Sequence, residues 1–347
     1  MSYTVPNFTR GQVNRAGGAL IVTNKSSQAM AEALVLINHW RACHAYPMNT
    51  FQATLRGRLK KVCADALVAT RMKRLPSIIK KLENNSGMQL ARMQDIGGLR
   101  AVVDSVSQVR KLHAIYTNGD FAHELIDTDD YIQTPKTSGY RSLHLIYRYK
   151  NDHAPDYNGL CLELQIRTRL QHAWATAVET IGSFLNQALK SNEGPEDWLD
   201  YFKVVGSAFA LIEKCPVADQ FAGESPNDIY KRCIALEKAL DVRRKLNAFA
   251  VAANAITSSN VGGNFHLIVL DAVERTVTIS SFGKKRLDEA NAAYAAAEKV
   301  ALSHSDMQTV LVSTVSVDSL RRAYPNYFLD TEQFLAALVR IEKLALA

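Results

Sequence analysis

Between Tyr131 and Thr168 the chain gathers side chains suited to handling a nucleotide polyphosphate. Lys136 and Arg141 bring fixed positive charge to a glycine-containing turn. Tyr140 offers a flat ring on which a base can stack, and His144 can donate a hydrogen bond to a phosphate oxygen. Fixed cations beside an aromatic face predict a site for a phosphorylated ligand.

Two runs of alternating polarity, Leu143–Tyr149 and Leu162–Thr168, predict the β-strands that position these groups. Side chains alternate along a strand, so Glu163 and Gln165 would project from one face, with Arg167 beside them. A carboxylate would then stand close to the basic and aromatic groups of the preceding turn.

Two more clusters of chemically capable residues lie upstream. The first, over 71–81, contains an Arg-x-Lys followed by Ser-Ile and a lysine: Arg71, Lys73, Ser77 and Lys80. The second is Asp95-Ile-Gly-Gly-Leu-Arg100, which enters an apolar strand at Leu99–Val103. Carboxylates such as Asp95 and Glu163 are the hard oxygen ligands that Mg²⁺ prefers.

These blocks, in this order over about residues 50–190, resemble the synthetase domain of the RelA/SpoT family, which moves pyrophosphate from ATP to a ribose 3′-hydroxyl. The resemblance implies an α/β (α+β) fold, with a mixed-sheet, nucleotidyltransferase-like domain flanked by helices. It implies that Asp95 holds Mg²⁺, and that Glu163 holds the metal, activates the attacking hydroxyl, or does both. The implied ATP-binding residues are Arg71, Lys73, Ser77, Lys80 and Arg100; the implied acceptor-binding residues are Lys136, Tyr140, His144, Gln165 and Arg167.

Several of these roles have structural alternatives. Tyr140 and His144 are also compatible with a buried core, Lys81 with a solvated surface position, and Arg167 with bracing Glu163.

The net charge of +7 is unevenly distributed. Residues 1–190 carry 24 lysines and arginines against 14 acids, and the remainder carries 17 against 20. Between Arg56 and Lys81, nine basic residues stand with a single acid, Asp65. This pattern predicts a polyanion partner, either nucleotide phosphates or an RNA backbone, rather than a solvated helix face. The predicted tRNA-binding residues are Arg56, Arg58, Lys60 and Lys61.

The composition indicates a cytoplasmic protein of two domains. The 347 residues, 47% of them hydrophobic, can bury substantial cores. No apolar run approaches the roughly 20 residues that span a bilayer, and the N-terminus lacks the layout of a signal peptide. The five cysteines form no C-x-x-C pair, which predicts reduced thiols and no zinc site.

The predicted organisation is a synthetase domain over 1–214, a helical linker over 215–260 and a C-terminal regulatory domain over 261–347. Helices are expected over 26–46, closed by Pro47, from Asn49 or Thr50 to about 71, over 169–214 with a break at 191–195, and over about 228–256. The last section reads as a ββαβα unit: a hairpin of 265–270 and 276–281, a helix over 287–302, a strand over 309–314 and a helix capped by Asp330 or Thr331.

No His-Asp dipeptide occurs, so the hydrolase domain of the long RelA/SpoT enzymes is not expected and the product should persist. The C-terminal extension resembles the fused toxin–antitoxin CapRel proteins, with a pseudo-zinc-finger-like domain. That resemblance implies pyrophosphate transfer to the 3′-end of tRNA, blocking translation in anti-phage abortive infection. It also implies that Tyr324 and Tyr327 block the ATP site until phage major capsid protein binds. The alternatives are a small alarmone synthetase, making (p)ppGpp or (p)ppApp, and a non-catalytic RNA-binding module.

Overall fold

The computed structural model describes most of the chain. The described residues are 3–22, 27–119, 121–184, 194–246, 254–256, 265–271, 276–283, 285–301, 307–313 and 331–346, with the single residues 189, 274 and 303. Tyr324 and Tyr327 lie outside them. Within the described part, no helix is both long and apolar enough to cross a membrane.

Helices and strands alternate along the chain. The helices are α1 (Arg10–Leu20), α2 (Ser27–Ala42), α3 (Ala45–Leu59), α4 (Leu75–Asn84), α5 (Val106–Thr117), α6 (Arg169–Phe184), α7 (Glu196–Ile212), α8 (Pro226–Ala239), α10 (Leu287–Ala301) and α12 (Glu332–Leu346). The strands are β1 (Leu67–Met72), β2 (Gly97–Val103), β3 (Glu124–Asp130), β4 (Leu143–Arg148), β5 (Cys161–Thr168), β6 (Asn254–Ile256), β7 (Phe265–Asp271), β8 (Thr276–Phe282) and β9 (Met307–Ser313).

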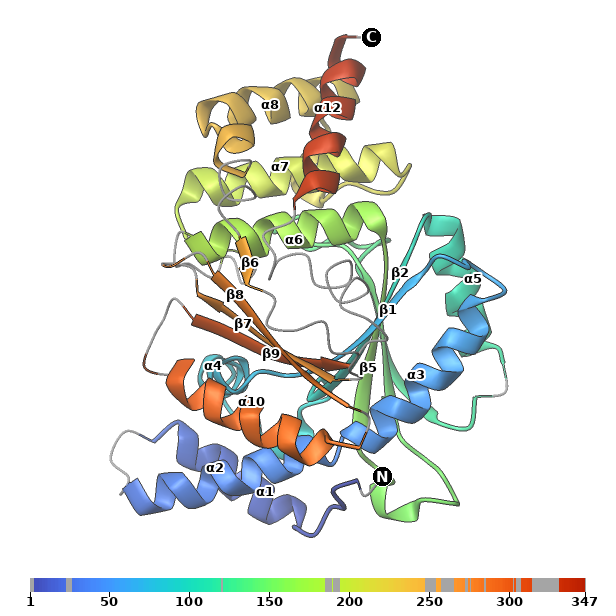
Figure 1. The fold of residues 1–347 in the computed structure, drawn as a ribbon. Coiled ribbons are helices and arrows are strands. Elements are labelled where there is room, and N and C mark those ends of the chain that lie inside the picture. Colours follow the sequence, from blue (N-terminus) through green and yellow to red (C-terminus); the bar gives the residue numbers. More distant parts are fainter. Residues whose placement is uncertain are drawn as a thin grey trace.

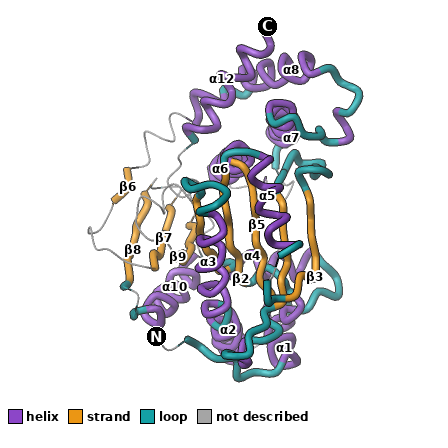
Figure 2. The backbone as a smooth tube through the Cα atoms, turned by 90° about the vertical axis from the view of Figure 1, so that its right-hand side faces the viewer, coloured by secondary structure: helices purple, strands orange, loops and turns teal. Residues whose placement is uncertain are grey.

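In the described residues, the strands form one mixed sheet in the order β3-β4-β5-β2-β1-β9-β7-β8-β6. β2 and β5 run parallel, while β1–β2, β3–β4 and β4–β5 pair antiparallel. Helices α6, α7, α8 and α12 stack at one end of this sheet, and α3 and α5 cover one face (Figures 1 and 2). The mixed α/β class predicted from the sequence is confirmed.

Period-two patterning explains how the central strands divide their side chains. Leu99, Ala101 and Val103 of β2 are buried in the main apolar core, together with Leu162, Leu164 and Ile166 of β5. The residues between them point to the other face, which carries the polar groups described below. A second apolar core lies among α6, α7, α8 and α12, where Phe334 packs against Phe202 and Phe209.

The C-terminal elements follow the predicted ββαβα order, and β7 and β8 form the predicted antiparallel hairpin. They do not stand apart from the rest, because β9 pairs with β1, at Thr70↔Ser313 and Arg71↔Val312. Helix α12 contributes to the core of α6, α7 and α8, whereas α10 packs on β7 and β9. The boundaries at 214 and 260 stay predictions.

Three sequence-based helix predictions were wrong in their bounds. The first, expected over 26–46 and closed by Pro47, is α2, which ends at Ala42. The second helix begins at Ala45, with Pro47 in its first turn, where a missing backbone N–H costs nothing. It ends at Leu59, and Arg71 lies on strand β1 rather than at a helix end. The helix expected over 228–256 is α8, ending at Ala239, and Asn254–Ile256 is strand β6.

Helix α1 was not predicted. Its signal is a capping box, in which Thr9 and Gln12 satisfy each other's backbone N–H groups. The helical region over 169–214 divides into α6 and α7, on either side of the expected break.

Candidate active site

A polar pocket of about 400 Å³ opens on the face of the sheet that carries the alternate residues of β1, β2, β4 and β5. It brings together most of the predicted site residues from separate parts of the sequence. Those lining it are Arg71, Lys73, Asp95, Arg100, Lys136, Tyr140, His144, Glu163 and Gln165. Lys81, Asp129 and Tyr131 also line it, and the sequence prediction assigned none of these three a role.

Strand register explains why distant motifs meet there. One row across the sheet places Asp129 beside His144, His144 beside Gln165, and Gln165 beside Arg100. The next row places Glu163 beside Gly98, and Gly98 beside Arg71. Side chains in these two rows share a face, so the three motifs meet within two pleats.

Gly98 leaves the floor of the pocket open between Glu163 and Arg71. A Cβ built on Gly98 meets nothing closer than the Arg71 carbonyl oxygen at 3.5 Å, an ordinary contact. At Gly97, by contrast, a Cβ would lie 2.7 Å from Leu162. The two glycines therefore serve different purposes, close packing at one position and open pocket at the other.

Asp95, which precedes β2, is held by two lysines. Its Oδ2 lies 2.6 Å from Nζ of Lys73, and its Oδ1 lies 3.0 Å from Nζ of Lys81. Burial alone would raise the pKa of Asp95, but the two lysines outweigh it and lower the pKa to about 2. Asp95 is therefore ionised at neutral pH. The alternative that Lys81 is merely solvated was wrong.

Glu163 is the end of a chain of polar contacts. Nδ1 of His144 lies 2.8 Å from its Oε1, and Gln165 donates to its Oε2 at 2.8 Å. Nε2 of His144 is 2.9 Å from the hydroxyl of Tyr140. Burial lowers the pKa of His144, but Tyr140 and Glu163 outweigh this effect and raise it to about 9. Burial raises the pKa of Glu163, but the bond and charge of His144 leave it lowered.

Both ring nitrogens of His144 thus have protein partners, so the histidine holds Glu163 rather than presenting a spare donor to a phosphate. Tyr140 is 7% exposed and packs edge-on against Trp174, so its ring is mainly part of the second core. Tyr131 is the more accessible ring of the pocket, with Nζ of Lys136 4.2 Å from its centroid.

Other predicted residues lie outside the pocket lining. Ser77 and Lys80 are on α4, but the lysine of that helix that reaches the pocket is Lys81. Arg167 is 1% exposed and donates to Oε1 of Gln165 at 3.0 Å, and Gln165 in turn donates to Glu163, so Arg167 contacts Glu163 through Gln165 and not directly. Burial and the charge of Arg100 lower the pKa of Arg167 to about 10. Arg141 is buried and paired with Glu213 at 3.0 Å.

The predicted tRNA-binding residues lie at the end of α3, which packs on the face of the sheet opposite the pocket. Among them, Lys60 and Lys61 are exposed. Arg58 instead packs over the rings of Tyr116 and Phe121, at 4.3 and 4.5 Å from their centroids. Burial lowers the pKa of Arg56, which is also partly covered. The structure does not bring this group to the pocket.

The pocket's donor set fits a divalent cation held with a polyphosphate. Asp95 and Glu163 both line the pocket, and the charge of Asp95 raises the pKa of Glu163. The two anions therefore repel each other. Mg²⁺ characteristically takes one or two carboxylates, with phosphates and water completing its shell. Asp95 and Glu163 are the residues that would hold it.

Residues 70–182 match the model of a family described as "Region found in RelA / SpoT proteins". The chain is 35% identical over 114 residues to GTP pyrophosphokinase YjbM of Bacillus subtilis (strain 168), covering 31% of this chain and 52% of that protein. It is 30% identical over 139 residues to GTP pyrophosphokinase YwaC of the same organism, covering 39% and 63%. The chain thus spans less than two thirds of either relative.

Among solved structures, a GTP pyrophosphokinase family protein from Streptococcus pneumoniae is 23% identical, with a TM-score of 0.43, covering 50% of this chain and 88% of that one. The small alarmone synthetase 1 from Bacillus subtilis is 24% identical, with a TM-score of 0.41, covering 50% and 90%. The family region contains every candidate site residue from Arg71 to Arg167.

Proposed function

Since residues 70–182 of this chain match the model of the RelA/SpoT family region, we propose that the chain is an ATP-dependent pyrophosphokinase. It transfers the β,γ-pyrophosphate of ATP to a ribose 3′-hydroxyl and releases AMP. The observation that carries the proposal is the convergence of two ionised carboxylates, Asp95 and Glu163, with several cations in one polar pocket.

The cationic side of the pocket suits the triphosphate. Arg71 lies on β1, Lys73 follows that strand, and Lys81 lies on α4. Lys73 and Lys81 are the partners of Asp95. Bound Mg²⁺ would neutralise charge on the transferred pyrophosphate and on the AMP that leaves. Lys73 and Lys81 can then exchange their carboxylate partner for phosphate oxygens, so the transferred group is held by fixed charges throughout.

Glu163 is suited to the acceptor hydroxyl. Its carboxylate is ionised and oriented from both sides, by His144 and by Gln165. An oriented carboxylate can accept the hydrogen bond of a 3′-hydroxyl and align its oxygen with the phosphorus. Tyr131 and Lys136 supply a ring and a charge on the same side, where the acceptor's base and phosphates would lie.

A purine nucleotide is the acceptor that the comparisons favour, because the two relatives bear the name GTP pyrophosphokinase. The product would be an alarmone such as (p)ppGpp or (p)ppApp. Tyr131, the more accessible ring of the pocket, would stack the purine base of this acceptor.

A second candidate acceptor is the 3′-end of tRNA, in a toxin restrained by its own C-terminal section. One observation supports it: β9, a strand of the C-terminal section, pairs with β1 at Arg71, which we assign to the ATP side of the pocket. In this version phage major capsid protein would release the restraint, and Tyr324 and Tyr327 would supply part of it. The exposed Lys60 and Lys61 would offer the tRNA backbone a phosphate-binding surface away from the pocket.

A competition assay tests the proposal and separates the acceptors. Purified protein is given [γ-³²P]ATP and Mg²⁺ with GDP, GTP, ATP and total tRNA together, and labelled products are resolved. Label in nucleotides supports the first version, and label in tRNA supports the second. Asp95→Asn and Glu163→Gln should each lower transfer by at least about 10²-fold. Absence of transfer to every acceptor would refute the proposed function.

A further inference from the structure

The pocket wall at 136–141 belongs to no helix or strand. Two backbone hydrogen bonds close it into a turn, from Gly139 N to Lys136 O at 2.8 Å and from Lys136 N to Tyr140 O at 3.2 Å. This segment, which we call the acceptor turn, places Lys136 and Tyr140 in the pocket. Two internal bonds do not fix where a turn stands, so its position depends on what holds it from outside.

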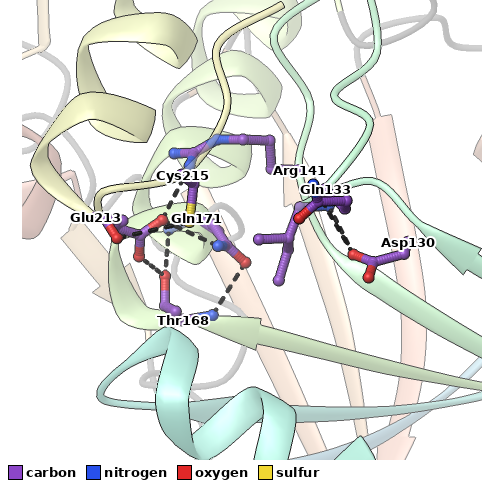
Figure 3. Close-up of polar contacts among 8 residues, drawn as sticks. Asp130, Gln133, Arg141, Thr168, Gln171, Glu213 and Cys215 are labelled. Atoms are coloured by element: carbon purple, nitrogen blue, oxygen red, sulfur yellow. Dashed lines mark hydrogen bonds and ion pairs between the residues drawn. The ribbon is translucent and has the colours of Figure 1, made fainter.

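Glu213, at the end of α7, is the first external anchor (Figure 3). Its Oε2 accepts hydrogen bonds from Arg141 at 3.0 Å and from Gln171 at 2.9 Å. Its Oε1 accepts one from Thr168, the last residue of β5. One carboxylate therefore joins the acceptor turn to the end of β5 and the start of α6.

The ion pair between Arg141 and Glu213 is nearly closed to solvent, with side-chain exposures of 3% and 10%. Burial lowers the pKa of Arg141, and the charge of Glu213 opposes that effect. A buried guanidinium without its carboxylate is unfavourable, so Arg141 is confined to the position that Glu213 defines.

Gly206, in the middle of α7, is the second anchor. A Cβ at Gly206 would lie 2.6 Å from the carbonyl oxygen of Gly139, closer than real side chains approach. Gly139 itself has φ of +85°, and a Cβ there would lie 2.9 Å from the carbonyl oxygen of Phe202. The backbones of helix and turn are thus in direct contact, which requires glycine on both sides.

We propose that α7, through Glu213 and Gly206, positions the acceptor turn and thereby sets how tightly the acceptor nucleotide binds. The inference rests on the proposed function for the assignment of the two sides of the pocket. Both anchors lie beyond residues 70–182, the part of the chain that matches the family. On the ATP side, Lys73 follows β1 and Lys81 lies on α4, and both are paired with Asp95.

The selectivity of this arrangement gives its test. Glu213→Gln removes the charge that holds Arg141 while preserving size, and Gly206→Ala pushes the helix against Gly139. A misplacement of about 1 Å in a reacting group can cost about 10²-fold in rate. Either variant should therefore raise the KM for GDP or GTP, and lower kcat/KM for that acceptor, by 10-fold to 10²-fold. The KM for ATP should stay within about twofold.

Equilibrium binding makes the test independent of turnover. The affinity for GDP and for a non-hydrolysable ATP analogue is measured by calorimetry on wild type, both variants and Asp200→Asn. Asp200 is an acid on the same helix, 42% exposed, whose partners are Arg232 at 3.2 Å and Lys203 at 3.6 Å, so its replacement should change neither affinity. Intact affinity for the ATP analogue also shows that a variant is folded.

Four outcomes are distinct. Weaker GDP binding with unchanged binding of the ATP analogue supports the positioning role, even if wild type transfers nothing and the proposed function fails. Equal loss of both affinities would mean that Glu213 and Gly206 serve general stability, and no change in either would mean that they do not position the turn. Failure of wild-type protein to bind either nucleotide would overturn both proposals.

Discussion

Removing the carboxylate of Glu298 should strongly destabilise the protein, because that group joins three parts of the chain. Glu298 lies on α10, and its side chain is 2% exposed. Its Oε2 is 2.6 Å from Nη1 of Arg41 on α2, and its Oε1 is 3.1 Å from Nη2. The same Oε1 accepts the backbone N–H of Leu75, the first residue of α4, at 2.8 Å.

The cost follows from what Glu298→Ala leaves behind. Truncating one partner of a buried ion pair costs about 3–5 kcal/mol, because the other charge stays buried. The first turn of α4 also loses an acceptor, and Arg74 makes no side-chain cap, which adds about 1 kcal/mol. We therefore expect the free energy of unfolding to fall by roughly 4–6 kcal/mol.

Urea unfolding of wild type, Glu298→Ala, Arg41→Met and a double variant that carries Glu298→Leu and Arg41→Met measures this effect. Replacing both charges with apolar groups is often nearly neutral, so the double variant of Glu298→Leu with Arg41→Met should recover most of the loss. Glu289→Ala serves as control, because Glu289 sits on the same helix in an exposed pair with Arg286. Its unfolding midpoint should not move.

A loss of less than about 1 kcal/mol for Glu298→Ala would refute this reasoning, because it would mean that the pair is solvated or replaceable. Glu298→Ala should also weaken ATP binding. Nε of Arg41 donates to the carbonyl oxygen of Lys73 at 3.1 Å, so the pair supports the lysine that holds Asp95.

Three further predictions concern the pocket. Gly98→Val should weaken ATP binding by at least about tenfold while the protein stays folded, whereas Gly97→Val should lower the melting temperature. Equal melting temperatures for the two variants would contradict this expectation. Lys81→Ala should reduce pyrophosphate transfer by about 10²-fold and Lys80→Ala by only a few-fold, and equal losses in the transfer assay would count against the Lys81–Asp95 assignment. The pKa of His144 is raised from 6.5 to about 9, so its contribution to the free energy of unfolding is complete below pH 6.5 and is lost as pH rises through 9. Urea unfolding at several pH values should show this loss in wild type and not in His144→Gln. Parallel pH profiles for the two proteins would refute it.

Local patterning predicted the elements that carry the candidate site. Alternating polarity identified β4 and β5, and with them the shared face of Glu163 and Gln165. The motif containing Asp95 predicted the entry into β2. These features depend on neighbours within a few residues, which is the range over which side-chain periodicity carries information.

The remaining features depend on tertiary contacts. Lys80 and Lys81 are adjacent, and only the packing of α4 decides which of them meets Asp95. Arg58 belonged to a basic run by sequence, yet its guanidinium lies on two rings of the core, one of them on another helix. The pairing of β1 with β9 joins strands whose sequences contain no mutual signal.

That pairing has a consequence for synthesis of the protein on the ribosome. Thr70 pairs with Ser313, 243 positions later, so at roughly 5–20 residues per second the partner emerges about 12–50 s after β1. Until then β1, which carries Arg71, is an edge strand with unpaired backbone groups open to other chains. A nascent polypeptide would thus hold the strand beside its nucleotide pocket incomplete for most of its translation, and its susceptibility to misassembly would be greatest in that interval.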